Sequence, residues 1–207
     1  MDLLKQEFKK ELSQARKVLD LGCGEGEIAK EVFGRRVEWG LDNDKKMVKK
    51  AKKSGRYKQV IWAGAEKMPL KNGEVDLVFS NSVLEHIFHL KQVLKEVSRV
   101  LKKDGLLIAT MPSDKLVEYI GWGRLYGWWF NQKYSHYHLY SKDKWRKFLQ
   151  KAGLELVDSY YYLDRPIIRQ WHKLLWLNKL GLKGKVKTGK VRRLSQGAGI
   201  AIKVRKK

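Results

Sequence analysis

The sequence predicts an α/β fold with a mostly parallel sheet, helices on both faces and an antiparallel last strand. Short apolar runs alternate with helical segments from Lys17 onward. One run, Val75–Ser80, is largely apolar, as expected for a strand that is buried on both faces. Near the end of the sequence, the residues of Gly199–Val204 alternate in the way that is typical of a strand. We expect this strand to pair antiparallel with Leu154–Leu163.

The first half of the chain supplies most of these elements. Met1–Lys17 mixes Lys and Glu with apolar residues, which predicts an amphipathic helix and not a signal peptide. Repeated strand–helix alternation then predicts a parallel sheet. The predicted strands are Val18–Leu21, Val37–Leu41, Gln59–Ala63, Val75–Ser80 and Leu106–Thr110, and the predicted helices are Glu25–Phe33, Lys45–Lys53 and Leu90–Leu101.

The second half is less regular and rich in aromatic residues. Tyr119–Tyr140 holds nine aromatic residues in 22, which predicts either a lid over a substrate or a cap that completes the core. Gly121, Gly123 and Gly127 would give such a lid hinges. A helix is expected over Lys142–Lys151, with Ser141 as its N-cap and Gly153 as its stop.

A basic insertion separates the last two predicted strands. Within Arg165–Gln196, Ile167–Leu180 predicts a basic amphipathic helix and Lys183–Arg193 a mobile loop. The alternatives for this helix are an anionic membrane surface, packing or dimerisation, and nucleic acid. We expect one domain over residues 1–207, with a cofactor-binding core at 17–112, an aromatic lid at 113–140 and the basic insertion at 164–198.

Charge and cysteine content narrow the possible partners. The net charge is +23, and Arg165–Lys207 holds 14 Lys and Arg with no Asp or Glu. Such a segment indicates an anionic partner, or simply a solvated basic tail. Cys23 is the only cysteine, so no internal disulfide and no zinc site of several cysteines is expected, and no metal is predicted. Without an apolar run of about 18 residues, a cytoplasmic protein is expected, with a peripheral membrane position as an alternative.

A glycine turn between the first strand and helix is the strongest local motif. Gly22, Gly24 and Gly26 let a ligand approach the backbone at the start of a helix. The spacing differs from the dinucleotide fingerprint G-x-G-x-x-G, because Glu27 occupies the place of its third glycine. Asp42 follows the second strand, where a carboxylate can accept hydrogen bonds from ribose hydroxyls or cap the next helix.

Five ordered motifs together resemble one enzyme family. They are Leu19–Gly26, Gly40–Asn43, Gly64–Leu70, Val75–Phe79 with Ser80–His86, and Val97–Leu107. This pattern closely resembles the class I S-adenosylmethionine-dependent methyltransferases, above all their type 11 branch, which includes ubiquinone and menaquinone biosynthesis enzymes. The resemblance covers about Lys17 to Pro112 and implies a Rossmann-like class I methyltransferase fold with a seven-stranded sheet, and S-adenosyl-L-methionine as cofactor.

The resemblance also implies a role for individual residues around the cofactor. The turn would lie against its methionine part, Asp42 would hold the ribose, and a loop after the third strand would flank the adenine. One departure is Gly64, where many relatives carry an aspartate, so a scaffold without turnover remains an alternative. The implied cofactor-binding residues are Asp20, Gly22, Cys23, Gly24, Asp42, Asn43, Ala65, Glu66, Ser80 and Asn81.

Candidate bases for removing a proton from the acceptor are histidines. His86 and His138 are the predicted catalytic residues, with His136 also considered, because histidine titrates near neutrality. His89 and His172 are expected on helix surfaces.

The acceptor class can be narrowed from motifs that the sequence lacks. Enzymes that methylate exocyclic amines of nucleic-acid bases carry a different motif at the position of Ser80–Val83. Enzymes that methylate C5 of cytosine need a cysteine nucleophile, and Cys23 lies in the glycine turn instead. We expect a small-molecule acceptor that is lipid-like or lipid-linked. An RNA methyltransferase that grips phosphates with its basic C-terminal region is the alternative.

Overall fold

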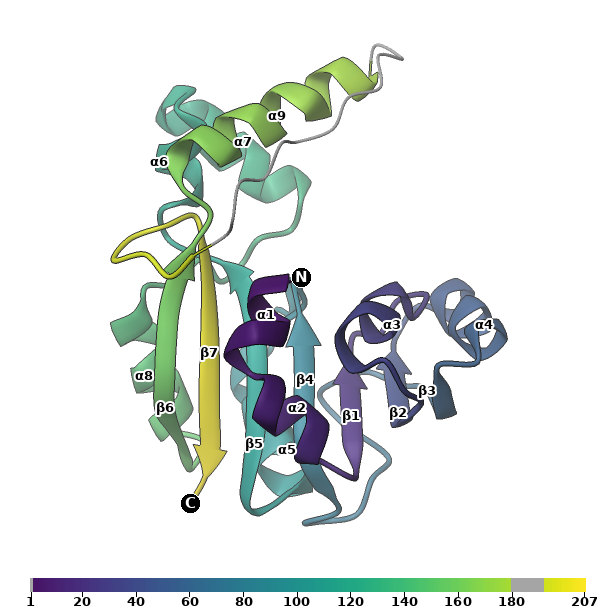
Figure 1. Cartoon of the computed structure of the whole chain (residues 1–207). Helices are drawn as coiled ribbons and strands as arrows, with labels where there is room; N and C mark the ends of the chain where they lie inside the picture. Colours follow the sequence, from purple (N-terminus) through teal and green to yellow (C-terminus); the bar gives the residue numbers. More distant parts are fainter. Residues whose placement is uncertain (1, 180–191) are drawn as a thin grey trace.

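The computed structural model describes residues 2–179 and 192–207, and its centre is one sheet of seven strands. The strand order is β3-β2-β1-β4-β5-β7-β6; the first five strands run parallel, and β7 pairs antiparallel with both β5 and β6 (Figure 1). The bounds are β1 Val18–Leu21, β2 Val37–Asp42, β3 Tyr57–Trp62, β4 Val75–Asn81, β5 Leu101–Pro112, β6 Leu154–Tyr162 and β7 Gly199–Lys206. This confirms the predicted fold class.

Helices cover both faces of the sheet, and alternate strand residues decide which face each side chain joins. Val18 packs with the helices on one face, whereas Leu19 and Leu21 pack on the other, because successive side chains of a strand point to opposite sides. The first face carries α1 (Asp2–Glu7), α2 (Lys9–Gln14), α3 (Glu27–Phe33) and α4 (Lys45–Ser54); the second carries α5 (Leu90–Val100) and α8 (Lys142–Gln150).

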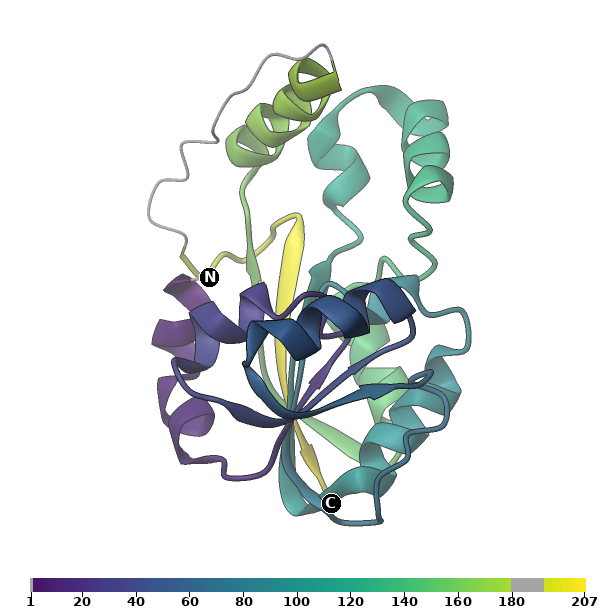
Figure 2. The ribbon, with the colours of Figure 1, turned by 90° about the vertical axis from the view of Figure 1, so that its right-hand side faces the viewer.

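Three further helices stand beyond the carboxyl ends of the parallel strands (Figure 1). They are α6 (Leu116–Ile120), α7 (Gly123–Lys133) and α9 (Arg165–Lys179), which we call the lid. The lid has a small core of its own, and in Figure 2 it rises above the sheet as a separate layer. This core contains Leu116, Ile120, Phe130, Ile168 and Ala198.

Several element boundaries differ from the sequence predictions for local reasons. The N-terminal helix is broken into α1 and α2 at Phe8, whose ring is 1% exposed and packs on Tyr160. Helix α3 begins at Glu27 because Gly26 has a φ of 92°, outside the helical region. Strand β5 begins at Leu101, five residues before the predicted strand, and it contains Asp104 with a φ of 61° where its register against β4 is irregular.

The lid corrects two expectations and shows packing for part of the α9 helix, one of the alternatives left open. Gly127 is not a hinge: it lies inside α7, where a Cβ would come within 1.9 Å of Val117 Cγ1, so it allows α6 and α7 to approach closely. His172 is not on a surface; it is 3% exposed, and its Nε2 lies 2.6 Å from the Tyr126 hydroxyl. The apolar side of α9 packs on the other two lid helices, α6 and α7, through Ile168 and Trp171.

The basic insertion is described only in part. The predicted helix Ile167–Leu180 corresponds to α9, and most of the predicted loop Lys183–Arg193 lies outside the described residues. Arg193, at the end of that loop, pairs with Glu7 and Asp158. Within residues 2–179 and 192–207, every helix falls short of the length and apolarity that crossing a membrane requires.

Candidate functional site

The glycine turn after β1 packs closely against two neighbouring segments. The backbone N–H groups of Gly22 and Cys23 both donate to the Leu41 carbonyl, at 2.8 and 3.0 Å, which fixes the turn to the end of β2. Gly22 has a φ of 74°, and a Cβ there would lie 2.3 Å from Val83 Cγ2. Only glycine fits both this backbone conformation and this contact.

Asp42 closes the same end of the sheet and holds the turn from β2. Its Oδ2 accepts from the Gly24 N–H at 2.9 Å, and its Oδ1 accepts from the Asp44 N–H at 2.9 Å. A carboxylate has about four acceptor positions, so it can still accept from a ligand. The alternative of Asp42 as a helix cap is wrong, because Asp44 caps α4 by accepting from Lys46 and Met47.

Asp20 and Cys23 lie beneath the turn and support it. Asp20 is 3% exposed, and the Tyr57 hydroxyl of β3 donates to its Oδ2 at 2.7 Å. Burial and, to a smaller extent, the charge of Asp42 raise the pKa of Asp20, the Tyr57 hydrogen bond lowers it, and the net result is a pKa of about 7. Cys23 is buried beside them, and burial raises the pKa of its thiol, so it is not a reactive thiolate.

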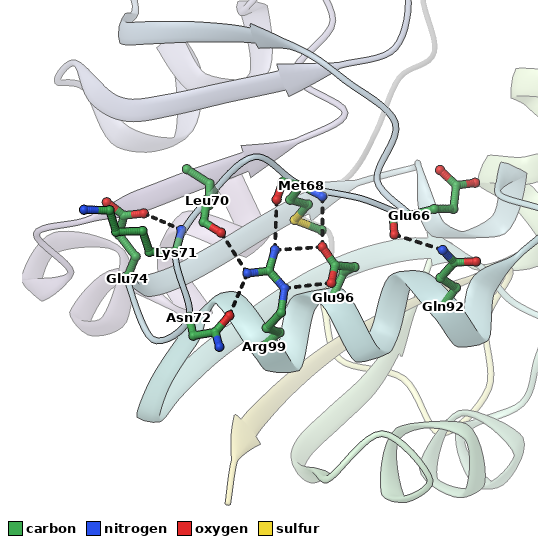
Figure 3. A network of polar contacts seen from close by, with 9 residues as sticks. All are labelled: Glu66, Met68, Leu70, Lys71, Asn72, Glu74, Gln92, Glu96 and Arg99. Carbon is green, nitrogen blue, oxygen red and sulfur yellow. Dashed lines mark hydrogen bonds and ion pairs between the residues drawn. The ribbon is translucent and has the colours of Figure 1, made fainter.

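The loop between β3 and β4, which carries Ala65 and Glu66, is fastened to α5 (Figure 3). Arg99 donates to Glu96 from Nε at 2.7 Å and from Nη2 at 2.8 Å, and it donates to the carbonyls of Met68 and Leu70. Gln92 donates to the Glu66 carbonyl at 3.1 Å. The three α5 side chains therefore hold the loop at a fixed distance from the glycine turn.

These segments enclose a cavity of about 390 Å³ whose lining is polar and apolar in similar measure, and we call it the polar cavity because it contains the side chains of Asp42, Glu66 and His86. Of the predicted cofactor residues, Gly22, Asp42, Asn43, Ala65 and Glu66 line it, together with the predicted base His86. Asp20, Cys23 and Gly24 do not line the cavity. Cys23 and Gly24 belong to the turn, and Asp20 lies beneath it. Ser80 is fully buried, and Asn81 accepts from the Thr110 hydroxyl at 2.7 Å. The remaining lining residues are Leu21, Leu41, Ala63, Ser82, Val83, Ile87 and Phe88.

The three candidate bases differ in which ring nitrogen has a free lone pair. His86 Nδ1 lies 3.2 Å from the Ser135 carbonyl, so Nδ1 carries the proton and Nε2 keeps its lone pair. His138 uses both nitrogens, with Ile87 O and the Tyr140 hydroxyl each at 2.8 Å. Burial lowers the pKa of His138, and it lines a different cavity, beside Phe88. The geometry therefore favours His86.

His86 has two titratable neighbours. Its ring lies 5.1 Å from that of His136, and burial, with a smaller electrostatic contribution from His86, lowers the pKa of His136 to about 4. Its Nε2 lies 3.5 Å from Oε1 of Glu85. Glu85 is fully buried, neither carboxyl oxygen has a hydrogen-bond partner within the described chain, and burial raises its pKa to about 8.

A second cavity, of about 440 Å³, lies under the lid and is lined mainly by apolar side chains. Leu116 of α6 and Ile167, Ile168 and Trp171 of α9 line one part of it. Ser82, in the loop after β4, lines both this cavity and the polar one. Its φ of 53° is in the left-handed region, which is uncommon for serine and marks a constrained turn at the junction.

Sequence reasoning missed four residues of this region. Ser82 and Val83 stood inside a motif from which only Ser80, Asn81 and His86 were assigned roles, and their positions depend on the positive φ of Ser82. Tyr57 lies at the start of β3, before the predicted strand. For Arg99, the i, i+3 spacing to Glu96 was a usable signal of an ion pair on α5.

Comparisons with known proteins agree with this geometry. Residues 19–109 match the family described as a methyltransferase domain. An uncharacterized protein of Methanocaldococcus jannaschii is 40% identical over 55% of this chain and 43% of its own length. A malonyl-[acyl-carrier protein] O-methyltransferase of Legionella pneumophila is 34% identical over 46% of this chain and 36% of its own length. The chain thus spans less than half the length of these curated relatives.

A solved structure extends the likeness to nearly the whole chain. It is a SAM-dependent methyltransferase of Thermotoga maritima, described as a possible histamine N-methyltransferase, with a TM-score of 0.70 and 22% identity over 98% of this chain and 86% of its own. At this identity the likeness concerns the fold. Residues 19–109 therefore belong to the methyltransferase domain family, and the chain as a whole has the fold of S-adenosylmethionine-dependent methyltransferases.

Proposed function

We propose that the protein transfers a methyl group from S-adenosylmethionine to a small acceptor with an apolar, lipid-like body. The observation that carries this proposal is that one residue, Ser82, lines both the polar cavity beside the glycine turn and the apolar cavity under the lid. A donor in the first cavity and an acceptor in the second would meet there. Positioning of two reactants is the main contribution that a protein makes to such a transfer.

The residues of the polar cavity fit the cofactor. Gly22 lets a ligand lie against the backbone, and the carboxylates of Asp42 and Glu66 give the lining a negative character that suits a sulfonium cation. Asp42 would hold the ribose hydroxyls, and Ala65 and Glu66 would flank the adenine. The cofactor supplies an activated methyl group, so the protein need not generate one.

The acceptor side needs an apolar surface and, for an O or N acceptor with a proton, a base. Ile167, Ile168 and Trp171 would contact the apolar body of the acceptor. When the methyl group leaves the sulfonium sulfur for the acceptor atom, S-adenosylhomocysteine would remain as the leaving group, and the proton of the acceptor atom would pass to Nε2 of His86. Oε1 of the nearby protonated Glu85 carboxyl, 3.5 Å from that nitrogen, would accept a hydrogen bond from the resulting imidazolium.

The domain limits follow the same division. Residues 17–112 would bind the cofactor, while the described helices of segments 113–140 and 164–198, which are α6, α7 and α9, would cover the acceptor. One relative is named a malonyl-[acyl-carrier protein] O-methyltransferase. An acyl-linked acceptor is therefore also a candidate within the proposed class of acceptors with an apolar body. Nothing in residues 2–179 and 192–207 favours the RNA alternative.

Transfer of a tritiated methyl group into a whole-cell extract tests this proposal. After incubation with labelled S-adenosylmethionine, the extract is divided into lipid, soluble small-molecule, protein and RNA fractions. We expect the label in the lipid or small-molecule fraction. Label confined to RNA, or cofactor binding without any transfer, would contradict the proposal.

A further inference from the structure

Large apolar side chains project from two sides of helix α7, and only those on one side pack in the lid core. Phe130 is 2% exposed and faces the lid core. On the other side, Leu125 is 86% exposed and Trp128 is 64% exposed, and Trp129 is exposed as well. Leu125, Trp128 and Trp129 follow the i, i+3, i+4 spacing that places side chains on one face of a helix.

Helix α9 extends this exposed surface. The Trp176 ring stacks on the Trp122 ring with centroids 5.9 Å apart, and both rings are exposed. Soluble surfaces rarely gather so many large apolar side chains unless they contact a partner or a membrane. We call this surface the exposed aromatic face; its residues are Trp122, Leu125, Trp128, Trp129 and Trp176.

Basic side chains surround the exposed aromatic face. The Lys133 ammonium lies 4.7 Å from the centre of the Trp129 ring. Arg169 and Lys173 of α9 are exposed. Neither α7 nor α9 contains an Asp or Glu, and the sequence from Arg165 to Lys207 contains none either. The surface is therefore both apolar and positively charged.

We propose that the exposed aromatic face docks the protein onto a bilayer surface that contains anionic lipid. Tryptophan rings prefer the interface between lipid tails and headgroups, and Lys and Arg are attracted to anionic headgroups. A bilayer accommodates protruding side chains such as Leu125 and Trp128 without a matching groove, whereas a folded acidic protein would need one for each.

The same helices connect the docking surface to the proposed acceptor site. Leu116, Ile168 and Trp171, which line the apolar cavity, belong to α6 and α9. Docking by α7 and α9 would therefore place the cavity next to the lipid. This last step rests on the proposed function, whereas the docking itself does not.

Sedimentation with lipid vesicles tests the docking. The probes are vesicles of phosphatidylcholine mixed with phosphatidylglycerol, and vesicles of phosphatidylcholine alone, at low and high salt. The double variant Leu125→Ser/Trp128→Ser removes the two most exposed large apolar side chains in the described part of α7. Val157→Ser, at an exposed apolar residue of β6, is the control. The fold of each variant is checked by its thermal midpoint and by binding of S-adenosylhomocysteine.

We expect the wild type and Val157→Ser to bind the anionic vesicles, more weakly at high salt because ions screen the attraction. The double variant is expected to bind at least about tenfold more weakly, since two large side chains no longer enter the interface. Three results would overturn the proposal: no binding of the wild type to anionic vesicles, equal binding of the double variant, or a wild-type dimer that the double variant disperses. None of these readouts needs methyl transfer, so the proposed activity can fail separately.

Discussion

The two cavities that meet at Ser82 are built in opposite ways. The polar cavity is made by a backbone turn, a carboxylate at a strand end and a loop fastened by Arg99. The apolar cavity is made by side chains from α6, α9 and the segments around β7. The first needs fixed main-chain geometry, whereas the second needs only apolar surface of suitable shape. The polar cavity should therefore be sensitive to single polar changes, and the apolar one to changes of volume.

The largest expected effect concerns Glu85, the buried carboxyl beside His86. Burial raises its pKa from 4.5 to about 8, so the native state keeps a proton that the unfolded chain releases. Between these two values the unfolded state binds fewer protons, and stability falls as pH rises. Glu85→Gln removes this penalty. We expect the variant to gain stability relative to wild type from pH 5 to pH 8.5, by up to about 5 kcal/mol, in urea unfolding.

Glu31→Gln, on the exposed surface of α3, is the matched control and should show no such trend. A stability difference between Glu85→Gln and wild type that does not change with pH would mean that Glu85 ionises normally in the native state. It would also remove the reason to place this carboxyl in the proton chemistry of His86.

A second test separates the two carboxylates at the end of β2. Asp42→Ala removes the acceptor that faces Gly24 and the cavity. We expect cofactor binding to weaken more than tenfold, because the variant loses a hydrogen bond to a charged group that contributes about 1.5–3 kcal/mol. Asp44→Ala removes the cap of α4 and is expected to cost about 1 kcal/mol of stability while affinity is preserved. Equal calorimetric affinity of Asp42→Ala and wild type would remove Asp42 from the site.

The polar cavity was largely predictable from the sequence because its chemistry is local. Gly22 directly follows the apolar strand β1, and Asp42 is the last residue of β2. Their positions at strand ends could therefore be predicted from the pattern of apolar residues. Predictions failed where a position depends on distant packing. Gly127 was expected to be a hinge, yet it faces Val117 of another helix. His172 was expected on a surface, yet it lies in the lid core against Tyr126.

The apolar cavity was predictable only as a tendency of the aromatic segment to cover something. Its lining comes from segments as far apart as Ser82 and Gly199, and no spacing in the sequence brings these together. The same holds for Glu85, because its burial results from the fold around the loop after β4 and not from its neighbours in the chain. Composition predicts that a cavity or cap exists here, but not which side chains line it.

The smallest expected effect tests whether volume alone controls the apolar side. Ile167→Trp would fill part of the cavity from the first turn of α9 without changing a polar group. We expect acceptor labelling to fall by about tenfold, roughly 1.4 kcal/mol, while S-adenosylhomocysteine binds with unchanged affinity. Leu174→Trp adds the same ring to the same helix at a position that does not line the cavity, and it should leave labelling intact. If Ile167→Trp weakens cofactor binding as much as labelling, the two cavities act as one site, and their division at Ser82 has no functional meaning.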